Sequence, residues 1–166
     1  MKQWITDVAD FPKKGIMFRD ISPLLAHPEK FQESLSALLK GVDLSQVDYT
    51  AGIESRGFIL GAALASKTSK GFIPIRKRGK LPPPVESHSY TLEYGQDTIE
   101  MKPGKGRVLL IDDVLATGGT LAAAIALCKK AGYEVMDVAV LIDLQYLNQF
   151  RWGAGKSVRS VVQYHQ

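Results

Sequence analysis

Short, almost wholly apolar runs recur along the chain, and most of them alternate with segments that have helical spacing. The apolar runs predict buried strands over residues 49–53, 72–76, 107–111, 135–142 and 158–164. Helices are expected between Pro28 and Gly41, over residues 58–65 and over residues 120–130. Because strands alternate with helices, this pattern predicts an α/β fold with a mainly parallel sheet flanked by helices on both faces.

Two regions depart from this alternation. Residues 1–25 show no regular period and are expected to be irregular. Residues 89–102 alternate polar and apolar positions on both sides of Gly95-Gln-Asp97, which predicts an inserted hairpin with its turn at these three residues. The expected fold is therefore a parallel sheet with one antiparallel insertion.

The stretch before the hairpin combines positive charge with residues that break strands. Lys77-Arg-Gly-Lys80 is followed by three prolines at positions 82–84, so residues 79–90 are expected to belong to neither neighbouring strand. Gly79 offers a hinge, and the prolines make the following pieces stiff and extended. This combination predicts a flexible lid that closes over a site.

Composition narrows the class of protein. With 166 residues and 18.2 kDa, the chain fits one domain over residues 1–166. The net charge of +4 is too small to argue for nucleic-acid binding, and it suits an anionic small molecule. No apolar run approaches the ~20 residues that span a bilayer, so no membrane association is expected. The one cysteine, Cys128, favours a cytoplasmic location and is expected to be a buried structural thiol.

The most informative stretch is Val108–Thr120, in which a buried strand, two acids, a glycine-rich loop and a helix follow one another. Ligands of open α/β sheets lie beyond the carboxyl ends of the strands. Thr117-Gly-Gly-Thr120 can turn several N–H groups toward one anion, and the following helix adds its positive dipole end. Asp112 and Asp113 are acceptors suited to the hydroxyls of a sugar. The stretch predicts a sugar-phosphate site, and the alternative is an ordinary strand-to-helix loop.

These thirteen residues resemble the phosphoribosyl diphosphate motif of type I phosphoribosyltransferases. Further segments are similar, in order and spacing, to the adenine-specific branch of that family: Phe18–Leu24, Glu54–Phe58, Arg76–Pro82 and Ser89–Gly95. The resemblance covers nearly the whole chain. It implies the type I phosphoribosyltransferase fold, with residues 1–25 as a small hood and residues 77–102 as a lid loop and hairpin.

The resemblance also implies an activity and the residues that perform it. The expected reaction is the transfer of ribose 5-phosphate from phosphoribosyl diphosphate to N9 of adenine, which gives AMP and diphosphate in purine salvage. The 5′-phosphate would be held by Ala116, Thr117, Gly118, Gly119 and Thr120, and the ribose hydroxyls by Asp112 and Asp113. Diphosphate would be bound by Arg56, Arg76, Lys77 and Lys80, of which Arg56 and Lys80 are also expected to assist catalysis. Mg²⁺ would be bound mainly through the diphosphate, without dedicated protein ligands.

The base site is expected on the hood. By resemblance, adenine would lie against Met17, Phe18 and Arg19, with Leu144 on its other face. For Phe18 and Leu144 the alternative is ordinary core packing. Glu93 matches the family carboxylate that handles a purine ring proton. Without the resemblance, the sequence favours a solvent-exposed glutamate in a strand.

Position 116 bears on the choice of base. Family enzymes for 6-oxopurines carry an acid there, so Ala116 disfavours hypoxanthine and guanine. Two alternatives stay open, a phosphoribosyltransferase for another purine and a non-catalytic sensor of phosphoribosyl diphosphate. The chain departs from the family at Asp143, where Glu is usual, and at Asn148-Gln149, where Lys-Gly is usual. A homodimer is expected, with some basic loop residues acting across its interface.

Overall fold

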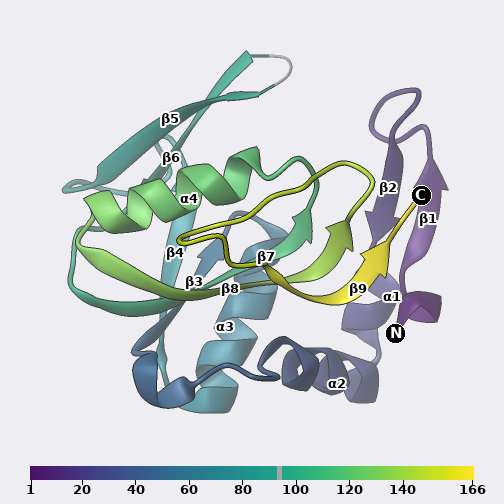
Figure 1. Cartoon of the computed structure of the whole chain (residues 1–166), viewed down its shortest axis with the longest axis horizontal. Helices are drawn as coiled ribbons and strands as arrows, with labels where there is room; N and C mark the ends of the chain where they lie inside the picture. The colour runs from purple at the N-terminus through teal and green to yellow at the C-terminus, as the bar shows by residue number, and fades with distance from the viewer. Residues whose placement is uncertain (93–94) are drawn as a thin grey trace.

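The computed structural model describes residues 1–92 and 95–166, and it is built around one seven-stranded sheet with the order β5-β6-β4-β3-β7-β8-β9 (Figure 1). The strands of this sheet are β3 (Tyr49–Ile53), β4 (Gly71–Lys77), β5 (Glu86–Leu92), β6 (Gly95–Met101), β7 (Gly106–Leu115), β8 (Tyr133–Leu144) and β9 (Arg159–Tyr164). Strands β4, β3, β7, β8 and β9 are parallel neighbours, while β6 joins β4 antiparallel and β5 pairs with β6. The predicted α/β class and the inserted hairpin are confirmed.

Helices cover both faces of the sheet, because alternate side chains of each buried strand point to opposite faces. The helices are α1 (Ser22–Ala26), α2 (Pro28–Leu38), α3 (Arg56–Thr68) and α4 (Gly119–Lys130), with short 3₁₀ turns η1 (Lys2–Trp4) and η2 (Leu44–Gln46). Helix α4 lies on one face, and α2 and α3 lie on the other (Figure 1). Within β7, Leu110 faces α4, whereas Leu109 and Ile111 belong to the cluster beneath α2 and α3.

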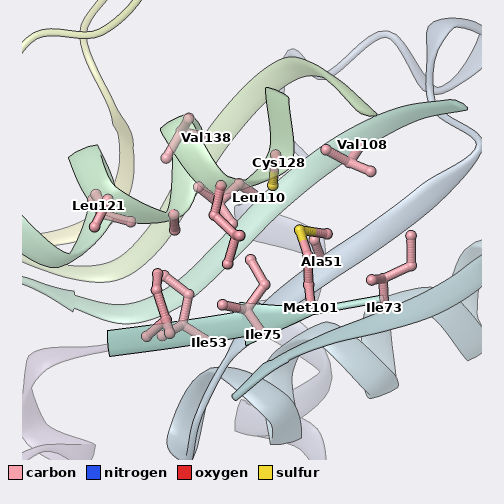
Figure 2. Close-up of a cluster of buried hydrophobic side chains, with 14 of the residues drawn as sticks. Ala51, Ile53, Ile73, Ile75, Met101, Val108, Leu110, Leu121, Cys128 and Val138 are labelled. Carbon is pink, nitrogen blue, oxygen red and sulfur yellow. The ribbon is translucent and has the colours of Figure 1, made fainter. Parts of the chain in front are cut away.

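The cluster on the α4 side includes the single cysteine. Cys128 is fully buried among apolar side chains of the sheet, beside Leu110 and Val138 (Figure 2). Burial raises the pKa of its thiol to about 12. The expectation of a buried structural thiol is confirmed.

The N-terminal segment is more regular than expected. Strands β1 (Thr6–Ala9) and β2 (Met17–Asp20) form a separate antiparallel hairpin, followed by the short helix α1. The prediction of an irregular segment was wrong because all four β1 residues are exposed, so no alternation of polar and apolar positions marks the strand. This hairpin lies on the side of the molecule to which the β7 and β8 arrows point, whereas the β5–β6 hairpin lies beside α4 (Figure 1).

Strand β7 is longer than expected. Asp112 and Asp113 were predicted to follow the strand, but β7 continues to Leu115. Its partner β8 also continues, and the pairs Val114↔Ile142 and Leu115↔Asp143 supply the backbone hydrogen bonds that extend it. Both acids therefore lie within the last four residues of a central strand and not in the loop.

The segment predicted as the lid is shorter than expected. Residues 86–90 belong to β5 and not to a loop, which leaves residues 78–85 between β4 and β5. The predicted turn at Gly95-Gln-Asp97 is also wrong, because β6 begins at Gly95 and pairs with β5 from there. Helices in the described ranges 1–92 and 95–166 all fall short of the length and apolar character needed to cross a membrane.

Candidate active site

The loop after β7 and the start of α4 form the predicted phosphate cup. Helix α4 begins at Gly119 after Gly118, whose φ of 92° lies in the left-handed region that glycine adopts readily. The Ala122 N–H donates to the Gly118 carbonyl at 2.9 Å and starts the helical hydrogen bonds. The N–H groups before it have no partner within the helix, and no described side chain caps them. This end of α4 is therefore suited to an anion.

The two predicted ribose acids are buried beside the cup. Asp112 and Asp113 are 8% and 6% exposed, and the Asp113 N–H donates to Asp112 Oδ1 at 2.9 Å. Burial and the neighbouring charge of Asp113 raise the pKa of Asp112 well above its ordinary value. Burial also raises the pKa of Asp113, although the Arg56 guanidinium opposes that shift. Two acids in such surroundings favour hydrogen-bond donors or positive charge nearby.

Arg56 connects these acids to the N-terminal hairpin. It is the first residue of α3, and its Nη2 lies 2.5 Å from Asp113 Oδ2. Its Nη1 donates to the Arg19 carbonyl at 2.9 Å, and the guanidinium lies 4.7 Å from the centre of the Phe18 ring. Helix α3 can begin this close to β7 because residue 57 is glycine: a Cβ there would lie 2.9 Å from Asp112 Oδ1. Arg56 is thus placed between the predicted ribose and base sites.

Two of the cations predicted to bind diphosphate, Arg76 and Lys77, lie on β4 and contact Glu54, which follows β3. The Glu54 carboxylate accepts the Lys77 N–H at 3.0 Å and Arg76 Nε at 3.3 Å, and these contacts lower its pKa, the Lys77 N–H most of all. Lys77 Nζ lies 3.4 Å from an Asp97 carboxylate oxygen. The Lys80 carbonyl accepts Arg76 Nη1 at 3.1 Å, and the Lys80 side chain is exposed. Arg76 and Lys77 are therefore held in place by carboxylates, whereas Lys80 faces solvent.

A cavity of about 240 Å³ brings several of these groups together. It is lined by Ile53, Glu54, Ile75, Lys77, Tyr90, Asp97, Ile99 and Thr120. Thr120 from the cup and Lys77 from β4 thus face the same space, although they are 43 positions apart in the sequence. A more open depression of about 630 Å³ lies between Met1-Lys2 and residues 160–163 of β9, and its lining includes none of the predicted site residues.

Comparison with known proteins agrees with this arrangement. Residues 24–147 match the family model described as a phosphoribosyl transferase domain. The chain is 58% identical over 164 residues to an adenine phosphoribosyltransferase of Bdellovibrio bacteriovorus, covering 99% of both chains. The chain belongs to the adenine phosphoribosyltransferase family. The crystal structure of the Rhodothermus marinus enzyme superimposes with a TM-score of 0.90 at 48% identity, covering 98% of this chain and 96% of that one.

A solved structure with a bound base is also similar. The adenine phosphoribosyltransferase of Saccharomyces cerevisiae, crystallised with an imino-altritol bisphosphate and adenine, has a TM-score of 0.84 at 32% identity. The match covers 96% of this chain and 93% of the yeast chain. The predicted family and fold are therefore confirmed.

The predicted base residues of this phosphoribosyltransferase lie in three different environments. Met17 is 42% exposed, and Phe18 is half-buried with its ring 5.1 Å from that of Phe11. Arg19 is buried, forms an ion pair with Asp7 and lies 3.9 Å over the Tyr164 ring. The three residues are consecutive in β2, so their side chains alternate between the two faces of this hairpin.

Leu144 lies elsewhere in the phosphoribosyltransferase fold. It is the last residue of β8, 6% exposed and part of the apolar cluster beneath α2 and α3. Ordinary core packing, the alternative raised from the sequence, therefore accounts for its burial. Its contact with a base stays a prediction. Glu93, the predicted proton-handling residue, lies outside the described residues.

Two residues without a predicted role help to shape this site. Glu54 holds Arg76 and Lys77 in place through hydrogen bonds. It could have been found from the sequence, because it belongs to the Glu54-Ser-Arg-Gly57 segment that also contains Arg56. Phe150 lies against Gly118: a Cβ built on that glycine would be 2.6 Å from the ring. No sequence pattern indicates this second contact, because it joins segments 32 positions apart.

Proposed function

We propose that this chain transfers the 5-phosphoribosyl group from 5-phosphoribosyl 1-diphosphate to N9 of adenine, giving AMP and diphosphate. The observation that carries the proposal is the 58% identity to an adenine phosphoribosyltransferase over 99% of both chains. The yeast relative crystallised with adenine supports the choice of base. Ala116, where 6-oxopurine enzymes carry an acid, agrees with it.

The anionic donor would lie along the edge of the sheet. The 5′-phosphate occupies the cup formed by Ala116–Thr120, where N–H groups of α4 and the hydroxyls of Thr117 and Thr120 donate to it. Asp112 and Asp113 accept hydrogen bonds from the ribose hydroxyls. These bonds supply the donors that two buried carboxylates with raised pKa values require.

The diphosphate would lie between α3 and β4. Arg56 at the start of α3 and Arg76, Lys77 and Lys80 on and after β4 neutralise its charge. Glu54 and Asp97 keep Arg76 and Lys77 oriented before the substrate arrives, so little side-chain freedom is lost on binding. Lys80 is exposed and lies in the loop proposed to close as a lid.

Mg²⁺ fits this donor chemistry and is part of the proposal. The described residues contain no group of three or more His, Cys, Asp or Glu that would enclose an ion, and Asp112 with Asp113 offers two carboxylates. Mg²⁺ is commonly held by one or two carboxylates together with substrate phosphates. When bound mainly through the diphosphate, the ion neutralises charge on the leaving group.

The transfer breaks the bond between ribose C1′ and the diphosphate oxygen and forms the bond between C1′ and N9 of adenine. The hood residues Met17, Phe18 and Arg19 hold the base in line with C1′, with Leu144 on its other face. Glu93 accepts the purine ring proton. Positive charge develops on the ribose, so closure of residues 78–85 over the site protects it from water.

The decisive experiment offers Mg²⁺ and phosphoribosyl diphosphate with adenine, hypoxanthine, guanine or xanthine, and measures nucleotide formation. The kcat/KM for adenine is expected to be at least about 100-fold higher than that for each of the other three bases. A site that hydrogen-bonds the amino group of adenine would leave its own polar atoms unpaired when an oxopurine binds. Preference for another base would contradict the adenine proposal. Binding of phosphoribosyl diphosphate without turnover would favour a sensor.

A further inference from the structure

One side-chain amide holds the turn that follows β8. Asn148 Nδ2 donates to Asp143 Oδ1 at 3.2 Å and to the Leu144 carbonyl at 2.9 Å. Asn148 Oδ1 accepts the Phe150 N–H at 3.1 Å. Both amide hydrogens and the amide oxygen are therefore engaged, and they connect the end of β8 to the backbone of Phe150.

Phe150 in turn limits the conformation of the phosphate cup. A Cβ built on Gly118 would lie 2.6 Å from Cδ2 and 3.0 Å from Cβ of Phe150, so the Phe150 side chain lies directly against the loop. Gly118 is buried, and its φ of 92° sets the direction in which α4 begins. Any movement of Phe150 would open space on this side of the loop.

At its other end, the Asn148 network reaches Asp143 of β8, which lies beside the strand β7 that carries Asp112 and Asp113. Asp143 pairs with Leu115, the residue of β7 that precedes the cup. Its carboxylate is buried, and Gln145 Nε2 at 3.4 Å is its weaker amide partner. Removal of the Asn148 amide would leave a buried carboxylate with this long contact, which is costly enough to rearrange the turn.

We propose that Asn148 is a positioning residue for the 5′-phosphate: by fixing Phe150 against Gly118, it keeps the loop in the conformation that directs the first N–H groups of α4 at the phosphate. This inference rests on the proposed function. A preorganised loop binds an anion more tightly than one that must be ordered on binding.

Asn148→Ala tests the proposal through the two substrates separately. We expect the KM for phosphoribosyl diphosphate to rise about tenfold, with the KM for adenine within about twofold of wild type. Calorimetric titration with ribose 5-phosphate should show a matching loss of affinity. Phe150→Ala should reproduce both effects, and the double variant should add little, because the two residues act in one chain of contacts.

Gln145→Ala is the matched control. It removes the longer amide contact to the same Asp143 carboxylate from an exposed side chain, so both KM values and the ribose 5-phosphate affinity should stay within about twofold of wild type. Circular dichroism establishes that each variant is folded. If Asn148→Ala does not fold, Phe150→Ala decides alone: weakened ribose 5-phosphate binding supports the proposal, and unchanged binding overturns it.

The remaining outcomes are distinct. A rise in the KM for adenine with unchanged ribose 5-phosphate affinity would overturn the proposal, because the turn would then shape the base site. Weakened ribose 5-phosphate binding in Asn148→Ala, in a protein whose wild type forms no AMP, would leave the positioning role standing and contradict the proposed function.

Discussion

At the residue scale, two aspartates near opposite ends of the parallel strands show how position decides what a carboxylate does. Asp112 near the carboxyl end is buried beside another acid, which raises its pKa. Asp48 precedes β3 at the other end, where the side chain and N–H of Arg107 lower its pKa to about 2. The first carboxylate destabilises the folded chain when charged, and the second stabilises it.

Asp112→Asn should raise thermal stability while weakening substrate binding. Because the folded pKa of Asp112 lies above its ordinary value of 3.8, the folded state binds the proton more tightly, and stability falls as the pH rises through the raised value. The gain in Tm should therefore grow in thermal melts as the pH rises from 3.8 through the raised folded value. Affinity for phosphoribosyl diphosphate should fall about tenfold or more, measured by calorimetry. A variant that melts below wild type at pH 8 would contradict this account.

Asp48→Asn is the matched substitution with the opposite sign. The folded pKa of Asp48, about 2, lies below its ordinary value of 3.8, so its contribution is present above 3.8 and is lost as the pH falls toward 2. We expect a lower Tm than wild type at neutral pH and a difference that shrinks in this acid range. Substrate affinity should be unchanged, because Asp48 lies at the far end of the sheet. Equal melting temperatures at neutral pH would show that the ion pair contributes nothing.

Glu93→Gln tests the proposed handling of the ring proton. General acid–base assistance is worth about 10²–10⁴-fold, so kcat should fall by this factor while the KM for adenine changes less. Glu86→Gln is a suitable control, since Glu86 lies in β5 and its carboxylate pairs with Lys130 at 3.4 Å. Turnover of Glu93→Gln within about threefold of wild type would remove Glu93 from the mechanism.

At the scale of elements, local sequence patterns explain where sequence reasoning succeeded, and contact between distant segments explains most of its failures. Strand β3 was predicted with its observed bounds because its apolar run is bounded by polar residues. The end of β7 was placed too early because the hydrogen bonds that extend it come from β8. Strand β1 was missed because no side chain in it is buried. Asp112, Asp113 and the glycine-rich loop could be identified as candidate ligand-binding groups from their residue types and order. The role of Phe150 could not, because it depends on tertiary contact alone.

The loop between β4 and β5 should be protected from trypsin by substrate. Its start is held to β6, since the Arg78 N–H donates to the Thr98 carbonyl at 2.9 Å and the Gly79 N–H to Glu100 at 3.0 Å. Saturating phosphoribosyl diphosphate and Mg²⁺ should slow cleavage after Arg78 and Lys80 about tenfold, because the lid closes on the diphosphate. Cleavage after Lys105, in the turn before β7, is the internal control. Unchanged rates at all three positions would show that this loop is not a lid.

At the scale of the whole molecule, an exposed apolar residue lies on the helix that begins the site. Ile59 of α3 is 43% exposed, and the same helix starts with Arg56. A second copy that covers this face would bury Ile59 and place its own surface near the predicted diphosphate site. Closed two-fold dimers are the commonest arrangement of identical chains.

Sedimentation should therefore detect a homodimer at about micromolar protein, twice the 18.2 kDa of one chain. Ile59→Glu should shift the equilibrium toward monomer and raise the KM for phosphoribosyl diphosphate, because a buried charge opposes association. Ile16→Glu, also an exposed isoleucine but on the N-terminal hairpin, is the control and should remain dimeric. A wild-type protein that sediments as a monomer would refute the pairing.

The reactivity of the buried Cys128 thiol can be used to measure local opening of the structure around α4. Thiol reagents attack the thiolate, and a thiol with a pKa of about 12 beneath α4 supplies almost none while the helix stays on the sheet. The labelling rate with such a reagent therefore measures how often α4 leaves the sheet. Since the same helix begins at the phosphate cup, ribose 5-phosphate should slow labelling in proportion to its occupancy. Ligand binding can thus be followed by mass spectrometry at one native residue, without any turnover.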